Sequence, residues 1–200
     1  MNEEYDIYLA SASPRRRELL EQIGISYQRL VVDVPEVKKE DEVPEMYVLR
    51  LALQKARAGR VTLAADDLIP VLGADTVVVI DGEVLGKPAG RNEALAMMAR
   101  LSGQRHQVMS AVAIVGSDGE QQSRLSVSTV QFRDVSREEA VAYWETGEPT
   151  DKAGGYAIQG LAAVFIERLE GSYSGVMGLP LFETTDLLGQ FGIVPLAMRV

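Results

Sequence analysis

The sequence predicts a mixed α/β fold, an α+β arrangement in which helices flank a central sheet of parallel and antiparallel strands. Two observations carry this prediction. Strand-like apolar runs alternate with helix-like segments along the 200 residues, as they do in strand-helix-strand units. The dipeptides Asp81-Gly82 and Asp118-Gly119 also separate pairs of such runs, which is the signal for antiparallel hairpins. Because both kinds of connection occur, we expect a mixed sheet.

Helices are expected at five places, and local signals mark the first and the fourth most clearly. Ser13 suits the N-cap of the first helix, and Pro14 suits its first position. The fourth begins with a capping box from Ser136 to Glu139 and ends at Gly147. The five expected ranges are Pro14 to Ile23, Pro44 to Arg60, Asn92 to Leu101, Ser136 to Thr146 and Pro180 to Phe191.

Strands are expected at seven places, and no linker, repeat or low-complexity stretch separates them into groups. We therefore expect one domain over residues 1–200, a length that is sufficient to bury a full core. The expected strands are Asp6 to Ala10, Tyr27 to Val32, Val71 to Ile80, Glu83 to Leu85, Gln107 to Val115, Gln121 to Phe132 and Ala162 to Arg168.

Composition excludes several classes of function. The net charge of −9 and the pI of about 4.7 argue against sequence-independent binding to duplex nucleic acid or to anionic membranes. The longest apolar runs are strand-sized and the first residues are acidic, so we expect no membrane span, no signal peptide and a cytoplasmic protein.

The chain has no cysteine and one histidine, which excludes thiol catalysis, disulfides and zinc sites of the Cys/His type. His106 is expected at a strand edge, satisfied by a backbone partner and without a catalytic role. A metal would therefore be held by carboxylates and substrate oxygens, which suits Mg²⁺ or Mn²⁺.

The segment from Ser11 to Arg17 looks like an anion site at the start of a helix. Arginines fill the first helical turn after Ser13 and Pro14. Cations at this end oppose the helix macrodipole, at a cost of about 0.3 to 1 kcal/mol each, so a phosphate among them would remove the conflict. The alternative is a solvated basic face that happens to follow a helix cap.

Asp75 precedes a β-branched run, and a buried carboxylate needs a charge partner or a metal. If Asp81-Gly82 forms a two-residue turn, continuing the ladder places Thr76 opposite Lys87 and makes Asp75 and Lys87 neighbours. Either these two form a structural ion pair, or Asp75 binds a metal or activates water while Lys87 neutralises a phosphate.

Three other positions carry chemistry that the pattern leaves open. Lys55 shares a helix face with apolar residues, so it either extends past the helix to water or reaches the same polyanion as the arginines. Glu36 lies on a loop, where acids usually face solvent. Gln159 follows a glycine-rich stretch and could read a base edge, or the stretch is an entry into the next strand with Tyr156 as a core anchor. Val176 to Pro180 is expected to be a tight turn.

Taken together and in this order, these sequence stretches resemble the Maf family of nucleoside triphosphate pyrophosphatases. The resemblance runs from about Leu9 to Leu188. The matching strings are Ala10-Ser11-Ala12-Ser13-Pro14-Arg15-Arg16, Leu51 to Ala56, Gly73-Ala74-Asp75-Thr76, Gly86-Lys87-Pro88, Leu101-Ser102-Gly103, Asp151-Lys152-Ala153-Gly154-Gly155-Tyr156, Ile158-Gln159-Gly160 and Val176-Met177-Gly178-Leu179-Pro180.

The resemblance implies a cytoplasmic, metal-dependent homodimer that hydrolyses a nucleoside triphosphate to the monophosphate and pyrophosphate. It also implies a two-lobed fold around a central cleft, similar to inosine triphosphate pyrophosphatases. Asp75 would be the proton acceptor, with Lys87 beside it, and a divalent cation would bridge the triphosphate to Asp75 and Glu36. Many members carry adjacent Asp-Glu where this chain has Pro35-Glu36. The phosphates would be held by Ser11, Ser13, Arg15, Arg16, Lys55 and Lys87.

Three positions bear on the nucleobase. The branch of the family that acts on dTTP and UTP carries arginine, threonine and glutamine there, and this chain has Arg15, Thr76 and Gln159. The branch that acts on 7-methyl-GTP instead resembles Ser-Pro-Trp, Ser-Asp-Gln and Ser-Glu-Gly at these places. The resemblance therefore implies dTTP and UTP as substrates, with modified pyrimidine triphosphates as further candidates, and a role in clearing the nucleotide pool.

Two other functions stay open at this point. A nucleotide-binding regulator of cell division or septum formation, with little turnover, would need the cationic groups but no acid beside a polyanion. The presence of both Asp75 and Lys87 favours the enzyme over this alternative. A nucleotidyl or phosphoryl transferase would require an acceptor molecule and would not consume the triphosphate by hydrolysis alone.

Overall fold

The computed structural model describes residues 5–195, and within them the strands form one seven-stranded sheet. Its order is β2-β1-β3-β5-β6-β7, with β4 paired to β3. The strands are β1 (Ile7–Ala10), β2 (Tyr27–Arg29), β3 (Val71–Ile80), β4 (Glu83–Leu85), β5 (Arg105–Val115), β6 (Gln121–Phe132) and β7 (Ile166–Glu170). The helices are α1 (Pro14–Gln22), α2 (Pro44–Val61), α3 (Arg91–Leu101), α4 (Arg137–Glu145), α5 (Tyr173–Met177) and α6 (Leu181–Gln190), with short 3₁₀ helices η1 (Ala153–Gly155) and η2 (Leu161–Phe165).

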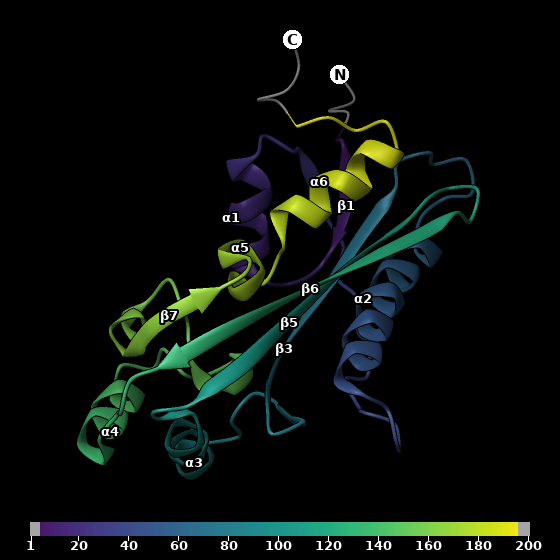
Figure 1. The fold of residues 1–200 in the computed structure, drawn as a ribbon. Coiled ribbons are helices and arrows are strands. Elements are labelled where there is room, and N and C mark those ends of the chain that lie inside the picture. The colour runs from purple at the N-terminus through teal and green to yellow at the C-terminus, as the bar shows by residue number, and fades with distance from the viewer. Residues whose placement is uncertain (1–4, 196–200) are drawn as a thin grey trace.

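The predicted mixed sheet is confirmed. Strands β1 and β2 run parallel to each other and β1 runs parallel to β3, whereas the long strands β3, β5 and β6 form an antiparallel ladder. Figure 1 shows these three long strands crossing the whole molecule. The predicted capping box at Ser136 is also confirmed, since its side chain and that of Glu139 each bond the other residue's backbone N–H.

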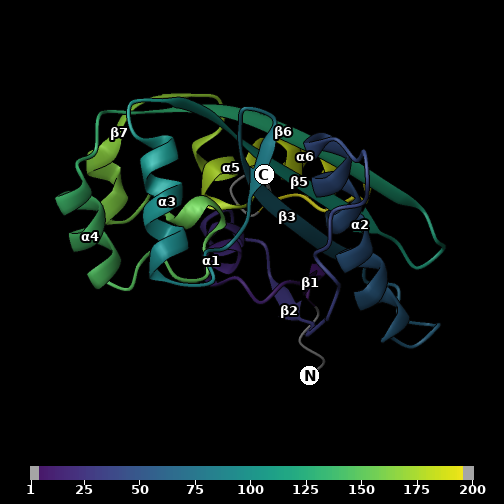
Figure 2. The same ribbon diagram turned by 90° about the horizontal axis from the view of Figure 1, so that it is seen from below.

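Both faces of the sheet are covered, but in different ways (Figures 1 and 2). Successive residues of a strand point to opposite faces. On one face, Leu72 packs with α1 and α6 near one end of β3, and Val78 packs with α3 and α4 near the other. On the opposite face, Val77 packs against α2. Thr76 therefore lies between two separate parts of the apolar core.

None of the helices within residues 5–195 combines the length and the apolar character that crossing a bilayer requires.

The edge of β3 that faces away from β5 is shared by two short strands. β1 pairs with it as far as Ala10 and Gly73, and β4 pairs with it from Leu85 and Val78 onward. Between these ladders, residues 74–77 have no strand partner on this edge within the described chain. The gap lies at the carboxyl end of β1, and ligands bind outside the carboxyl ends of strands in open α/β sheets.

Three sequence expectations were wrong in their boundaries. The strand expected over Tyr27 to Val32 ends at Arg29, because its partner β1 extends only to Ala10. Residues 162–165, expected to begin the last strand, belong to η2 instead, because the Glu148 carboxylate accepts the N–H groups of residues 161 and 162 and holds them in a turn. The tight turn expected over Val176 to Pro180 is the end of helix α5 and its passage into α6.

Candidate active site

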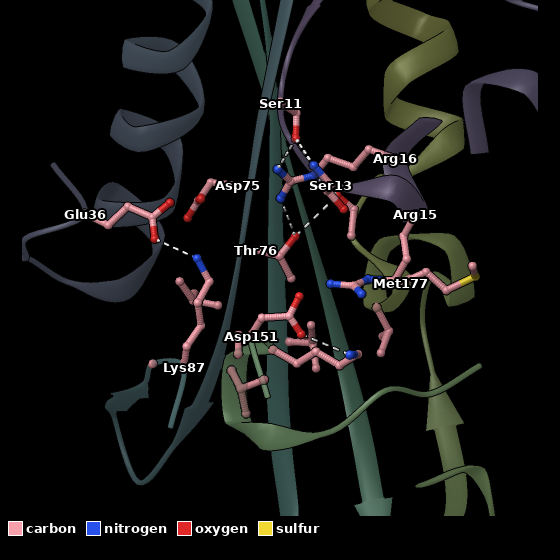
Figure 3. Close-up of a pocket in the computed structure, with 18 of the residues that line it drawn as sticks. Ser11, Ser13, Arg15, Arg16, Glu36, Asp75, Thr76, Lys87, Asp151 and Met177 are labelled. Carbon is pink, nitrogen blue, oxygen red and sulfur yellow. Dashed lines mark hydrogen bonds and ion pairs between the residues drawn. The ribbon is translucent and has the colours of Figure 1, made fainter. Parts of the chain in front are cut away.

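A pocket of about 390 Å³ opens at the gap in the edge of β3, within the size range of small-molecule sites. All ten residues that sequence analysis selected line it, and Figure 3 shows most of them facing a common space. They are Ser11, Ser13, Arg15, Arg16, Glu36, Lys55, Asp75, Thr76, Lys87 and Gln159. The pocket has two sides because Asp75 and Thr76, as successive strand residues, point to opposite faces of β3.

The side next to α2 is a network of ion pairs, which we call the charged half (Glu36, Lys55, Asp75 and Lys87). Lys55 Nζ lies 2.6 Å from Asp75 Oδ1 and 2.6 Å from Glu36 Oε1. Lys87 Nζ lies 3.2 Å from Glu36 Oε2. Of the two readings of Lys55, the structure favours the one in which its side chain turns into the site rather than past the helix to water.

The two carboxyls of this half have opposite pKa shifts. Burial raises the pKa of Asp75, and the neighbouring charges of Lys55 and Arg16 offset only part of this effect. Burial also acts on Glu36, but its hydrogen bond and charge contact with Lys55, together with Lys87, lower its pKa below the usual value. Glu36 is therefore the more permanent anion, whereas Asp75 has the higher affinity for a proton that a general base requires.

The predicted neighbourhood of Asp75 and Lys87 is corrected in one respect. The turn at Asp81-Gly82 does pair Ile80 with Glu83, but the ladder stops at Leu85 because the chain then turns away through Gly86 and Pro88. The structural ion pair between Asp75 and Lys87 is not formed, since Asp75 pairs with Lys55 and Lys87 pairs with Glu36. Both side chains still line the same pocket.

Helix α2 also holds the loop that carries Glu36. Tyr47 Oη donates to the backbone carbonyl of Glu36 at 2.9 Å, and Arg50 Nη2 donates to the carbonyl of Val37 at 3.0 Å. Arg50 further makes two short bonds, of 2.6 and 2.7 Å, to the carboxylate of Glu42 on the same loop. Glu36 is exposed, as expected for a loop acid, with 41% of its side chain accessible. Two α2 residues nevertheless fix its loop, and Lys55 binds its carboxylate at the pocket.

On the other side of β3 lies what we call the hydrogen-bonded half (Ser11, Arg16, Thr76 and Ser110). Arg16 is buried, and its guanidinium donates to the Gly178 carbonyl at 2.8 Å, to Ser11 Oγ at 3.1 Å and to Thr76 Oγ1 at 3.4 Å. Three of its five N–H donors are thus used within the protein. Arg16 is not the exposed cation at the helix N-terminus that the sequence suggested. Its side chain extends from α1 and bonds β3 and the end of α5.

The two serines of the turn before α1 differ in their hydrogen bonds. Ser13 occupies the N-cap position, but its side chain makes no capping hydrogen bond. Ser11 Oγ instead accepts from the Ser13 N–H at 3.2 Å and from Arg16 at 3.1 Å. Because both of these partners donate, the hydroxyl proton of Ser11 is left to bond a ligand oxygen.

Arg15 and Gln159 have no such ties. Within residues 5–195, neither side chain makes a hydrogen bond or an ion pair, and both line the pocket. Figure 3 shows Arg15 extending beside Met177 toward the open space. Their polar groups are thus available to a ligand without breaking an existing interaction.

His106 was expected at a strand edge with a backbone partner, and this was wrong. It is 2% exposed, inside β5, with its ring against Phe132 and Tyr156. Its Nε2 lies 2.7 Å from the Tyr156 hydroxyl, while Nδ1 has no hydrogen-bond partner among the described residues. Burial lowers the pKa of His106 to about 4. Tyr156 is a core anchor, as the alternative reading had it, and it also lines the pocket floor.

The charged half offers oxygen ligands for a hard divalent cation. Two carboxylates, Asp75 and Glu36, converge on the same Lys55 nitrogen, and Mg²⁺ is commonly held by one or two carboxylates together with substrate phosphates. No group of three or more His, Cys, Asp or Glu side chains within residues 5–195 forms a metal site by itself. The residues present therefore fit a cation that is completed by the ligand.

Sequence reasoning missed several residues that the structure brings to the site. Ser110 lies in an apolar run, and a hydroxyl among the buried residues 108–115 was the available signal. Lys152, next to Asp151 at 3.2 Å, lies in a string that was read for its glycines rather than for its cation. Tyr47 and Arg50 carried no signal, because their role depends on a loop whose path the sequence does not determine.

Fold and site define the class of this protein: an α/β protein with a pocket that gathers cations and a buried carboxylate, groups that suit a phosphorylated ligand. The chain belongs to the Maf family, since the family model described as "Maf-like protein" matches residues 6–191.

Curated relatives cover most of the chain. A protein of Alkalilimnicola ehrlichii named dTTP/UTP pyrophosphatase is 60% identical over 190 residues, which cover 94% of this chain and 93% of that protein. Proteins with the same name from Saccharophagus degradans and Burkholderia pseudomallei are 56% and 52% identical. They cover 94% and 91% of this chain, and the matches span 90% and 91% of those proteins.

Two solved structures are also similar. The crystal structure of the nucleoside-triphosphatase / dITP/XTP pyrophosphatase from Mycobacterium abscessus has 18% identity and a TM-score of 0.40, covering 63% of this chain and 73% of that one. The structure of the Staphylococcus aureus Ham1 protein has 16% identity and a TM-score of 0.44, covering 63% of this chain and 71% of that one.

Proposed function

We propose that this protein hydrolyses dTTP and UTP to the nucleoside monophosphate and pyrophosphate, and that it clears such pyrimidine triphosphates from the nucleotide pool. The observation that carries the proposal is the convergence of Lys55, Glu36 and Asp75 at the open edge of β3. The names of the curated relatives, at 52% to 60% identity, support the choice of substrates.

In the proposed mechanism, Asp75 accepts a proton from the attacking water at a carboxylate oxygen. Its raised pKa suits this role, and Lys55 fixes its orientation. The free proton of Ser11, the guanidinium of Arg15 and the exposed ammonium of Lys87 bind phosphate oxygens, with Ser13 and the unused N–H groups of Arg16 beside them. Positioning and charge neutralisation dominate in phosphorus displacements of this kind.

We propose that Asp75 and Glu36 hold a divalent cation, Mg²⁺ or Mn²⁺, together with the triphosphate. When bound, such a cation neutralises charge on the phosphate oxygens. We also propose that residues 1–200 form one Maf-like domain with two lobes, that the protein is cytoplasmic and homodimeric, and that it binds neither nucleic acid nor membranes. The net charge of −9 supports the last point.

A regulator that binds nucleotides without turnover is less consistent with this site. A sensor for a polyanion gains nothing from a buried carboxylate among its cations, because the carboxylate repels the ligand. Asp75 is only 6% exposed, and burial raises its pKa. Such an arrangement is typical of catalytic groups.

The test is a hydrolysis panel of dTTP, UTP, CTP, GTP, ATP and 7-methyl-GTP with and without Mg²⁺, with products separated chromatographically. We expect pyrophosphate release with preference for dTTP and UTP. Release confined to 7-methyl-GTP would reject the roles given to Arg15, Thr76 and Gln159. Turnover only with an added acceptor would indicate a transferase, and binding without turnover would indicate the regulator.

A further inference from the structure

The directions of the hydrogen bonds that Thr76 and Ser110 make can be deduced from the one proton that each hydroxyl carries. Ser110 Oγ lies 2.6 Å from the backbone carbonyl of Gly175 and 2.7 Å from Thr76 Oγ1. A carbonyl only accepts, and a serine hydroxyl has one proton, so Ser110 must donate to Gly175. The bond between the two hydroxyls then has one possible direction, from Thr76 to Ser110.

The single hydroxyl proton of Thr76 is therefore used inside the protein. The other acceptor near it, the Gly178 carbonyl, is 3.4 Å away and already accepts from Arg16 at 2.8 Å. Whether it bonds Ser110 or the Gly178 carbonyl, the Thr76 hydroxyl uses its proton within the protein. Toward a ligand, Thr76 Oγ1 can only accept a hydrogen bond.

The lining beside Thr76 includes apolar groups against which a nucleobase can pack. Thr76 lies on the face of β3 away from the charged half, and the pocket there is lined by apolar groups of Val108, Tyr156, Val176 and Met177. Figure 3 shows Thr76 between Arg15 and Met177 on one side and Glu36 and Lys87 on the other. With the phosphates between Lys87 and the turn before α1, as the proposed function has them, the nucleobase is left to the apolar part of the lining beside Thr76.

Building on the proposed function, we propose that Ser110 is a specificity-determining positioning residue, which makes Thr76 an obligate acceptor for the imide N3–H of uracil or thymine. Uracil and thymine share this one ring donor, whereas N3 of cytosine is an acceptor. With cytosine, Thr76 Oγ1 and the ring N3 would face each other as two acceptors with no proton between them. Leaving both without a hydrogen bond costs binding free energy in a partly buried site. Ser110 touches no part of the ligand and acts through Thr76.

The first test is Ser110→Ala, assayed by the ratio of kcat/KM for UTP to that for CTP. Without Ser110, the nearest acceptor left for Thr76 is the Gly178 carbonyl at 3.4 Å, so its hydroxyl can turn to donate to cytosine. We expect the UTP-over-CTP ratio to fall about fivefold to tenfold, the effect of one neutral hydrogen bond. The dissociation constants of α,β-methylene-UTP and α,β-methylene-CTP give the same ratio without turnover.

The matched control is Ser128→Ala. Ser128 is as buried as Ser110, lies on the next strand and also bonds the α5 segment, through the carbonyl and N–H of Ser172. It has no contact with Thr76. If Ser110 merely anchored α5, both variants would change the ratio equally, whereas we expect Ser128→Ala to leave it unchanged.

A double variant tests the route of the effect. Thr76→Val removes the hydroxyl at nearly constant shape, and Ser110→Ala added to it should then change the ratio no further. Equal binding of the two analogues by the unsubstituted protein would overturn the inference, as would an unchanged ratio in Ser110→Ala. If no triphosphate is hydrolysed but the uridine analogue binds more tightly, the proposed function fails while the inference stands.

Discussion

In the charged half of the pocket, ion pairs join side chains only, whereas in the hydrogen-bonded half two side chains are also fixed to backbone carbonyls. Lys55 and Lys87 hold Glu36 and Asp75 at distances of 2.6 to 3.2 Å, and these partners can be exchanged for phosphate oxygens. In the other half, Arg16 and Ser110 donate to the carbonyls of Gly178 and Gly175, whose positions depend on the fold.

The difference indicates a division of labour. Charges that pair with one another can re-pair when a triphosphate enters, so the charged half suits a ligand that changes during the reaction. Donors that are bound to fixed carbonyls present the same pattern before and after binding, which is the preorganisation that recognition requires. Four predictions follow from this contrast, from the largest expected effect to the smallest.

Asp75→Asn should lower kcat by about 10²- to 10⁴-fold, the usual range for a general acid or base. The folded state should not be destabilised. The raised pKa of Asp75 means that the folded state disfavours its ionised form, so at pH 7 removing this charge should leave the melting temperature unchanged or higher. Pyrophosphate release and differential scanning calorimetry on the same sample check both parts. Retention of most activity would exclude Asp75 as the base.

Lys55→Met should be the most destabilising change in the charged half. It leaves the carboxylate of Asp75 buried without its cation, and removal of one partner from a buried pair costs about 3 kcal/mol or more. Urea unfolding at pH 7 measures this loss. Asp75→Asn in the same chain should restore most of the stability, because no unpaired charge then remains.

The control for this prediction is Lys87→Met. Its ion pair with Glu36 is largely exposed, so the stability should change by no more than about 0.5 kcal/mol. An equal loss in both lysine variants would contradict the distinction between a buried and an exposed pair.

Outside both halves, the buried imidazole of His106 should make the stability of the protein depend on pH. Below its ordinary pKa of 6.5, His106 takes up a proton in the unfolded chain but not in the folded one, where burial lowers the pKa to about 4. Stability should therefore fall by about 3 kcal/mol in total as pH decreases between these values. In His106→Gln, the slope of unfolding free energy against pH should be smaller over this range, and an unchanged slope would reject the assignment.

How much of this site the sequence predicts depends on how local each signal is. The helix start at Pro14 and the hairpin at Asp81-Gly82 are encoded in neighbouring residues, and both were found. The partners of Asp75 and Lys87 were not, because the end of the β4 ladder depends on where Gly86 and Pro88 direct the chain. The residues that line the pocket were selected from local patterns and from the family resemblance. Which groups bond one another required the tertiary structure.

The arginine that holds the Glu36 loop gives the smallest effect and the sharpest test of how the charged half is assembled. Arg50 contacts neither Asp75 nor Lys55, but its bonds to Glu42 and to the Val37 carbonyl keep the loop against α2. Arg50→Gln should therefore raise the Mg²⁺ concentration for half-maximal activity about tenfold, within the range for changes behind a metal ligand, while kcat at saturating Mg²⁺ changes little.

Arg50→Lys should recover only part of this loss, because a lysine cannot reproduce the two parallel bonds to the Glu42 carboxylate. The comparison also separates positioning from charge. If a lysine at this position restored the full Mg²⁺ response, the positive charge of Arg50 would suffice. If Arg50→Gln lowered kcat at saturating Mg²⁺ as strongly as it raised the requirement for the cation, the loop would orient the reacting groups themselves rather than the side chain of Glu36.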